Sequence, residues 1–361
     1  MLFSSFVFLF AFLPVLIFIY YALPRNFRNA VLLVFSLFFY AWGGVSYTLI
    51  LLFSILVNYL FVQRISKNTT SRKKWLYAGV SFNVAIIVVF KYLDFFIENI
   101  NWLSPHFFES FPQLPLRHIV LPLGISFFTF QQISLLRDVY KNETKEKVNF
   151  SNIALYISFF PQLIAGPIVR YNDILHQIKS RRESISLFYS GTKRFIIGLF
   201  KKIVLANTCG ELADRIMSNS IDDISTPIAW LGIICYSFQI YFDFSGYSDM
   251  AIGLGRMFGF RILENFNLPY ISKSIQEFWR RWHISLSSWF KDYVYIPLGG
   301  DREGKIRTYL NLLIVFLLTG FWHGATWSFV IWGLFHGVFI TLERLGFKKV
   351  LLKVPAFFRW G

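Results

Sequence analysis

Residues 308–342, TYLNLLIVFLLTGFWHGATWSFVIWGLFHGVFITL, contain no Asp, Glu, Lys or Arg. An uncharged run of this length suffices for two membrane-spanning helices, because about 20 apolar residues cross the hydrocarbon core of a bilayer. Gly320 and Gly324 predict a break between the two helices. This stretch therefore indicates an integral membrane protein.

The rest of the chain has the same character. Of its 361 residues, 55% are hydrophobic and only 16% are charged. Apolar runs of about 20 residues recur along the whole length. The first, residues 1–23, carries no charge and lacks the basic start and cleavage site of a signal peptide, so we interpret it as a membrane helix. We predict an all-α polytopic protein of the inner or plasma membrane, with residues 1–361 forming one membrane domain.

Lys and Arg gather in short loops between the apolar runs, which predicts that these loops are cytoplasmic. The basic stretches 64–74 and 170–194 are both expected there, and the N-terminus outside. Acidic residues predict external loops at 98–116 and at Glu211, Asp214, Asp222 and Asp223. Because the net charge of +16 lies in such loops and no nucleic-acid motif occurs, we expect no nucleic-acid partner.

The apolar run 150–169 interrupts this alternation, since basic residues flank it on both sides. It contains Pro161, Gly166 and Pro167, which predict a re-entrant or broken hairpin. Irregular backbone at membrane depth occurs only where protein buries it or a wet cavity adjoins it. The alternative is an ordinary kinked helix whose end is misplaced.

Two histidines stand among aromatic residues. His323 lies in 320–327, GFWHGATW, where glycines allow another backbone or a ligand to approach closely and a buried neutral imidazole suits a general base. The alternative is a core histidine bonded to a neighbouring helix. We interpret His336, further along the same apolar run, as structural.

The second histidine lies in 278–290, FWRRWHISLSSWF, within an amphipathic run that we predict to be helical over 275–295. Helical spacing places Trp279, His283, Leu286 and Phe290 on one face. His283 would then point into a site, and Arg280 would meet an anionic ligand. The alternative is a helix that lies in the membrane interface.

Residues 241–249, YFDFSGYSD, place polar groups inside an apolar span, where each needs a reason. Ser245 and Asp249 are one helical turn apart. Asp249 could orient a histidine or pair with a cation such as Arg256; the alternative is polar contact between helices. The two cysteines and the absence of metal-ligand spacings predict no metal site.

Five motifs in order make the sequence similar to the membrane-bound O-acyltransferase family, and within it to the alginate O-acetylation group. They span about residues 120–342, the motif-bearing core, and are LPLGISFFTFQ (121–131), FPQLIAGPIVR (160–170), YFDFSGYSD (241–249), WRRWHIS (279–285) and GFWHG (320–324). The resemblance implies a ring of helices with re-entrant segments around a central funnel. It also implies that His323 matches the family's catalytic histidine and His283 its second signature histidine.

The resemblance further implies an acyl donor reached from the cytoplasm, such as acetyl-CoA or another thioester, with no bound cofactor. The acetyl group would pass to a periplasmic or extracellular acyltransferase partner and then to an exported polysaccharide such as alginate, while membrane lipid surrounds the protein. Members of this group usually continue for further helices, so we expect the chain to be incomplete at its C-terminus.

We therefore predict a membrane O-acetyltransferase with His323 and His283 as catalytic residues. The candidate substrate-binding residues are Arg280, Asp249, Ser245 and Trp322. The alternatives are D-alanyl transfer to a wall polymer, a membrane transporter that uses the intramembrane carboxylates, and a membrane scaffold.

Overall fold

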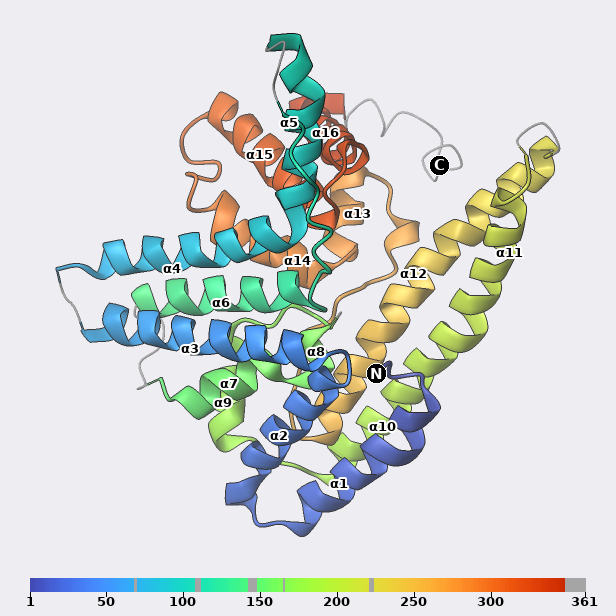
Figure 1. Cartoon of the computed structure of the whole chain (residues 1–361). Coiled ribbons are helices and arrows are strands. Elements are labelled where there is room, and N and C mark those ends of the chain that lie inside the picture. Colours follow the sequence, from blue (N-terminus) through green and yellow to red (C-terminus); the bar gives the residue numbers. More distant parts are fainter. Residues whose placement is uncertain (68–69, 108–111, 142–147, 165, 221–223, 348–361) are drawn as a thin grey trace. The chain divides into compact units, whose positions relative to one another are not determined.

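The computed structural model describes residues 1–67, 70–107, 112–141, 148–164, 166–220 and 224–347, and every regular element in these ranges is a helix (Figure 1). Five helices are long and apolar enough to cross a membrane: Val45–Lys67, Arg72–Phe107, Thr226–Met257, Lys305–His323 and Trp327–Phe347. The chain is thus a multi-pass, all-α membrane protein, as predicted. The loop residues Asp222 and Asp223 and the end of the chain from residue 348 lie outside the described residues.

The chain divides into two compact units, and each combines two stretches that are far apart in sequence. The first unit comprises residues 1–60 and 144–265, and the second comprises residues 61–143 and 266–361. Helix α3 begins in the first and ends in the second. The expected single domain and the central funnel stay predictions.

The first unit contains the N-terminal helices and the long helix α12. Its helices are α1 (Leu13–Ala22), α2 (Arg28–Ala41), most of α3 (Val45–Lys67), α7 (Phe150–Ser158), α8 (Phe160–Leu163), α9 (Tyr171–Ser180), α10 (Ile185–Phe200), α11 (Asn207–Met217) and α12 (Thr226–Met257). The predicted first membrane helix is a shorter apolar helix, Phe8–Ala22. Helices α2 and α3 are joined by the turn at Trp42–Gly44, where Gly44 has a φ of +145°.

The predicted break in residues 150–169 is confirmed. Helix α7 ends at Ser158, the short helix α8 starts at Phe160 with Pro161 in its first turn, and extended backbone leads into α9. Side chains bond the interrupted backbone: the Ser36 hydroxyl accepts from the Phe160 N–H at 3.1 Å, and Tyr156 donates to the Val169 carbonyl at 2.9 Å. Protein atoms thus bond part of the interrupted backbone; whether the segment is re-entrant stays a prediction.

The expected acidic loop at Glu211 and Asp214 is wrong, because both residues are helical. Helix α10 continues through a π-helical stretch, Lys201–Ala206, into α11, which ends at Met217. The apolar side chains of α11 pack inward: Ala213 is fully buried, and Ile216 lies against Gly232 of α12. Burial of this face extends the helix beyond the point where charge predicts a loop.

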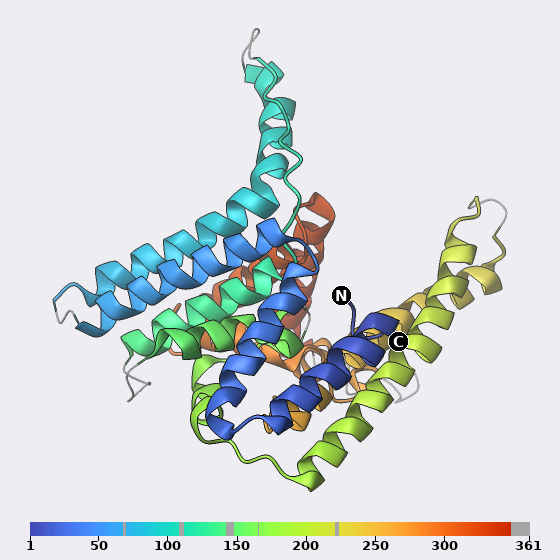
Figure 2. The same ribbon diagram turned by 60° about the horizontal axis from the view of Figure 1, so that its bottom comes forward.

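Helices α10 and α12 run side by side (Figures 1 and 2), and glycines let their backbones touch. A Cβ added to Gly191 would lie 2.6 Å from the Gly253 carbonyl oxygen, and one added to Gly198 would lie 2.5 Å from that of Gly246. Both pairs are spaced alike along the two helices. Close approach through small residues is a common basis of helix association in membranes.

We expect Gly198→Ala to destabilise the protein by about 1–3 kcal/mol, because the new methyl group meets backbone atoms that cannot move without separating the helices. The melting temperature in detergent measures this effect. Ile196→Ala, on the exposed side of the same helix, is the control and should leave the melting temperature unchanged. Equal melting temperatures for Gly198→Ala and the parent protein would contradict the tight packing.

The second unit contains the histidines. Its helices are α4 (Arg72–Ile87), α5 (Leu93–Phe107), α6 (Ile125–Tyr140), α13 (Ile275–Arg281), α14 (Ile284–Phe290), α15 (Lys305–His323) and α16 (Trp327–Leu342). The predicted break after Gly320 is confirmed, since α15 ends at His323 and α16 begins at Trp327. Helix α6 begins at Ile125, directly after Pro122 and the left-handed Gly124.

Candidate functional site

His323 ends helix α15, and the chain then turns sharply into α16. The Gly324 backbone is extended, and Gly320 and Gly333 let the two helices meet: a Cβ on Gly333 would lie 2.5 Å from the Phe316 carbonyl oxygen. The glycines beside this histidine were predicted to let another backbone approach. In the structure that backbone is the one of α16. His323 is held where two membrane spans converge.

Three aromatic rings lie beside the His323 imidazole. Its centroid lies 4.7 Å from Trp322, 4.6 Å from Trp332 and 5.8 Å from Phe329. The residue is nevertheless exposed, so the expected burial is only partly right. An imidazole with aromatic walls and an open side combines restricted orientation with access for a reactant.

The predicted single helix over residues 275–295 is wrong. Helix α13 ends at Arg281 and α14 begins at Ile284, with His283 between them at a φ of +43°. Such a left-handed conformation is uncommon for residues other than glycine, and strained residues of this kind gather at functional sites. The break divides the expected face between two helices, but all four of its residues are buried.

His283 is buried, with 1% of its surface exposed. Its ring centroid lies 5.6 Å from that of Trp322, and the Ser285 hydroxyl is 3.5 Å from its Nδ1. Burial, with a smaller contribution from His323, lowers the pKa of His283 to about 3. Its imidazole is therefore neutral at physiological pH. Trp322 contacts both histidines, so the structure brings together three of the predicted site residues.

His336 is joined to the same cluster through aromatic contacts. The Trp279 indole N–H donates to His336 Nδ1 at 3.4 Å, and Trp332 lies 4.7 Å from the His336 ring. Trp332 also contacts His323, so His336 helps to hold an aromatic ring that borders the site. This agrees with its interpretation as a structural residue.

Lys91 is a site residue that sequence reasoning missed. It lies in the membrane span Arg72–Phe107, in a π-helical stretch, and its ammonium donates to the Trp322 carbonyl. The adjacent Tyr92 hydroxyl donates to the Phe321 carbonyl. Two donors thus hold the last turn of α15, directly before His323. The sequence signal was a lysine inside an apolar run, where a charge needs a functional or structural reason.

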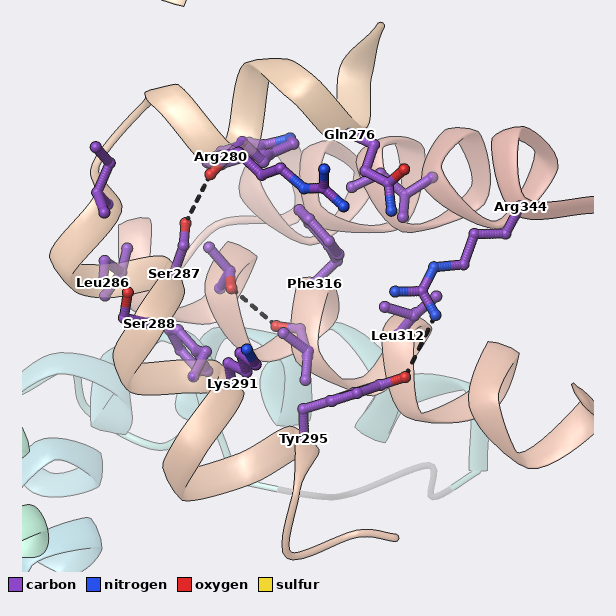
Figure 3. A pocket seen from close by; sticks show the side chains of 16 residues that line it. Gln276, Arg280, Leu286, Ser287, Ser288, Lys291, Tyr295, Leu312, Phe316 and Arg344 are labelled. Atoms are coloured by element: carbon purple, nitrogen blue, oxygen red, sulfur yellow. Dashed lines mark hydrogen bonds between the residues drawn. The ribbon is translucent and has the colours of Figure 1, made fainter. Parts of the chain in front are cut away.

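Arg280 lines a cavity of 390 Å³ beside the aromatic cluster (Figure 3). Trp279 and Phe316 also line this cavity, and their rings contact each other at 5.5 Å. The Ser287 hydroxyl donates to the Trp279 carbonyl at 3.2 Å, which ties α14 to α13 across their break. The structure thus assigns Arg280 to a cavity wall, as a ligand-binding role requires.

Asp249 and Ser245 belong to the first unit and are both buried on helix α12. Asp249 forms ion pairs of 2.6 Å with Arg194 and 2.7 Å with Lys201. The predicted cation partner is therefore of the right kind, but it is not Arg256, which lies 3.6 Å from Glu264. Within this unit, Asp249 connects α12 to the glycine-packed α10.

We expect Asp249→Asn to lower activity more than Asp243→Asn. Asp249 is buried and pairs with two cations, whereas the Asp243 side chain is 48% exposed and pairs with Lys202 alone. Loss of one partner from a buried ion pair destabilises a protein by about 3 kcal/mol. Activity at equal membrane protein level, with the melting temperature beside it, measures the difference, and equal values for the two variants would contradict it.

Comparison with known proteins is consistent with this site. A sequence model of the MBOAT, or membrane-bound O-acyltransferase, family matches residues 139–357. The chain is similar to a probable alginate O-acetylase of Pseudomonas aeruginosa, with 45% identity over 95% of this chain and 66% of that protein. It is also 40% identical to a peptidoglycan O-acetyltransferase of Helicobacter pylori, over 100% of this chain and 74% of that protein.

More distant similarity extends to a teichoic acid D-alanyltransferase of Bacillus subtilis, with 31% identity over 70% of this chain and 66% of that protein. The chain spans about two thirds of the length of the alginate O-acetylases that it matches. The family match covers both histidines, Trp322 and Arg280.

Proposed function

Because the chain belongs to the membrane-bound O-acyltransferase family, we propose that it is a membrane O-acetyltransferase that modifies a cell-envelope polysaccharide. The observation that carries this proposal is the pair His323 and His283, whose rings both contact Trp322. Proteins named as O-acetylases of alginate and peptidoglycan share at least 40% of its residues, which favours acetyl transfer over D-alanyl transfer.

In the proposed reaction, the oxygen of an acceptor hydroxyl attacks the carbonyl carbon of a thioester. His323, the exposed histidine, takes the hydroxyl proton as the new C–O bond forms, and the C–S bond then breaks. The proton passes from His323 to the departing thiolate, so the products are an ester and a thiol. A general base of this kind contributes about 10²–10⁴-fold, and positioning supplies the rest.

His283 has a different role in this proposal, since it is buried and neutral. It hydrogen-bonds the donor carbonyl or the acceptor. An acyl-histidine intermediate on His323 is the alternative route and gives the same products. We propose acetyl-CoA or another thioester as the donor, and a second acyltransferase outside the membrane as the partner that delivers the acetyl group to the polymer.

Membranes that contain the full-length protein test this function directly. With a donor labelled in its acetyl group, we expect label to appear in the envelope polymer and free thiol to be released in equal amount. Transfer of D-alanine from a carrier protein, with no acetyl transfer, would replace the proposal by the wall-polymer alternative. Solute transport in proteoliposomes without acyl turnover would replace it by the transporter.

A further inference from the structure

The cavity in the second unit has an apolar floor and a cationic rim (Figure 3). Its floor comes from the buried cluster of Leu312, Phe316 and Ile340 with Trp279. Its rim carries Arg280, Lys291 and Arg344, and all three are exposed. A cavity built in this way suits a ligand that has an anionic end and a hydrocarbon end.

The rim charges are not neutralised within the described part of the chain. There, no ion pair joins Arg280, Lys291 or Arg344 to a carboxylate, and Arg344 reaches only the Tyr295 hydroxyl, at 3.4 Å. Three cations that line one cavity without a counter-charge repel one another, and an anion in the cavity relieves that repulsion.

Neighbouring carboxylates are engaged elsewhere. Glu343, next to Arg344, is buried and accepts from the N–H groups of Ile275 and Gln276 at 2.7 and 3.1 Å, where it caps helix α13. Glu277 binds Arg281 at 2.9 Å. The fold therefore uses these carboxylates to hold α13 and leaves the rim charges available to a ligand.

The apolar residues of the cavity floor indicate which kind of anion binds there. Leu312, Phe316 and Ile340 belong to α15 and α16, which are membrane spans, so the floor extends from the rim toward the hydrocarbon region. A soluble phosphorylated compound would leave this floor without apolar contact. Basic pockets beside membrane helices bind anionic lipid headgroups, and a lipid chain adds the stabilisation of buried hydrocarbon.

We propose that this cavity binds an anionic phospholipid, with its phosphate between Arg280, Lys291 and Arg344 and one acyl chain along Phe316. The volume of 390 Å³ accommodates the headgroup and the start of a chain, and the remainder of the lipid stays in the bilayer. Trp279 forms part of the floor and also bonds His336, so the lipid packs against the wall that borders His323.

Lipid binding to the full-length protein tests this assignment without any acyl transfer. The protein is delipidated in detergent, phosphatidylglycerol or phosphatidylcholine is added, and native mass spectrometry counts the bound molecules. We expect phosphatidylglycerol to bind at least tenfold more tightly. The double variant Lys291→Gln, Arg344→Gln should weaken its binding roughly 30-fold, since each basic residue near a headgroup contributes about a factor of five.

The control is the double variant Arg302→Gln, Lys305→Gln, which removes two exposed charges of the same unit from outside the cavity and should bind like the parent. Arg280 is left unchanged because it is also a candidate substrate contact. Equal binding of the two lipids, or equal loss in the control, would overturn the proposal. Displacement of phosphatidylglycerol by acetyl-CoA, mole for mole, would reassign the cavity to the thioester donor. None of these results depends on whether the protein transfers acetyl groups.

Discussion

Replacement of His323 by alanine is expected to abolish acetyl transfer while the protein stays folded. The imidazole is the exposed base at the junction of α15 and α16, and loss of a general base lowers a rate by about 10²–10⁴-fold. Its ring contacts Trp322, Trp332 and Phe329 but forms no hydrogen bond within the described residues. The loss of stability should therefore be that of an ordinary substitution, about 1–3 kcal/mol.

The measurement is the acetyl content of the exported polymer in cells that express the full-length protein, with membrane protein level and melting temperature recorded beside it. His336→Ala is the matched control, because this histidine lies in the same aromatic cluster and bonds Trp279. The His336→Ala variant should lower the acetyl content only as far as it lowers the melting temperature and the amount of folded protein. Parental acetylation in the His323→Ala variant would contradict general-base catalysis by His323 and would favour the transporter or scaffold alternative.

The second large effect is expected at Lys91. Lys91→Met removes the ammonium that holds the Trp322 carbonyl, so the last turn of α15 loses a donor directly before His323. A shift of about 1 Å in a catalytic group is enough to lower a rate by about 10²-fold. We expect the turnover number to fall by roughly this factor, with little change in donor KM. Stability should change little, because removal of a charge from a membrane span offsets the lost hydrogen bond.

Lys74→Met is the control for Lys91→Met, since Lys74 is exposed at the start of the same helical span. Tyr92→Phe tests the second donor to this turn and should give a smaller loss in the same direction. A Lys91→Met protein with parental turnover would show that α15 positions His323 without help from this helix. If Lys91→Met lowers the melting temperature so far that the loss of folded protein accounts for the whole loss of activity, Lys91 has a structural role only.

Sequence reasoning located the elements whose signal is local. The charge-free run 308–342 and its glycines predicted α15, α16 and the break between them, and Pro161 predicted the interrupted segment of the first unit. In each case one physical constraint, bilayer thickness or a missing backbone N–H, acts on neighbouring residues.

Features that depend on tertiary contact could not be predicted in this way. The helical spacing of Trp279, His283 and Phe290 continues through the break at His283, so periodicity gave no sign of it. Lys91 was visible as a charge in an apolar run, but its partner is a backbone carbonyl more than 200 positions away along the chain. Arg194 and Lys201 likewise bind Asp249 because α10 lies against α12, and their spacing in sequence carries no information about that contact.

The division of each unit between two distant stretches determines how the protein must be made. Residues 1–60 are synthesised well before residues 144–265, with which they share a unit, and residues 61–143 likewise precede residues 266–361. The Ser36 hydroxyl, for instance, cannot bond the Phe160 N–H until α8 has been translated. Early helices must therefore wait in the bilayer with polar groups unmatched. Because these contacts form late, we expect the chain to be most prone to misfolding, and to degradation by proteases, during membrane insertion.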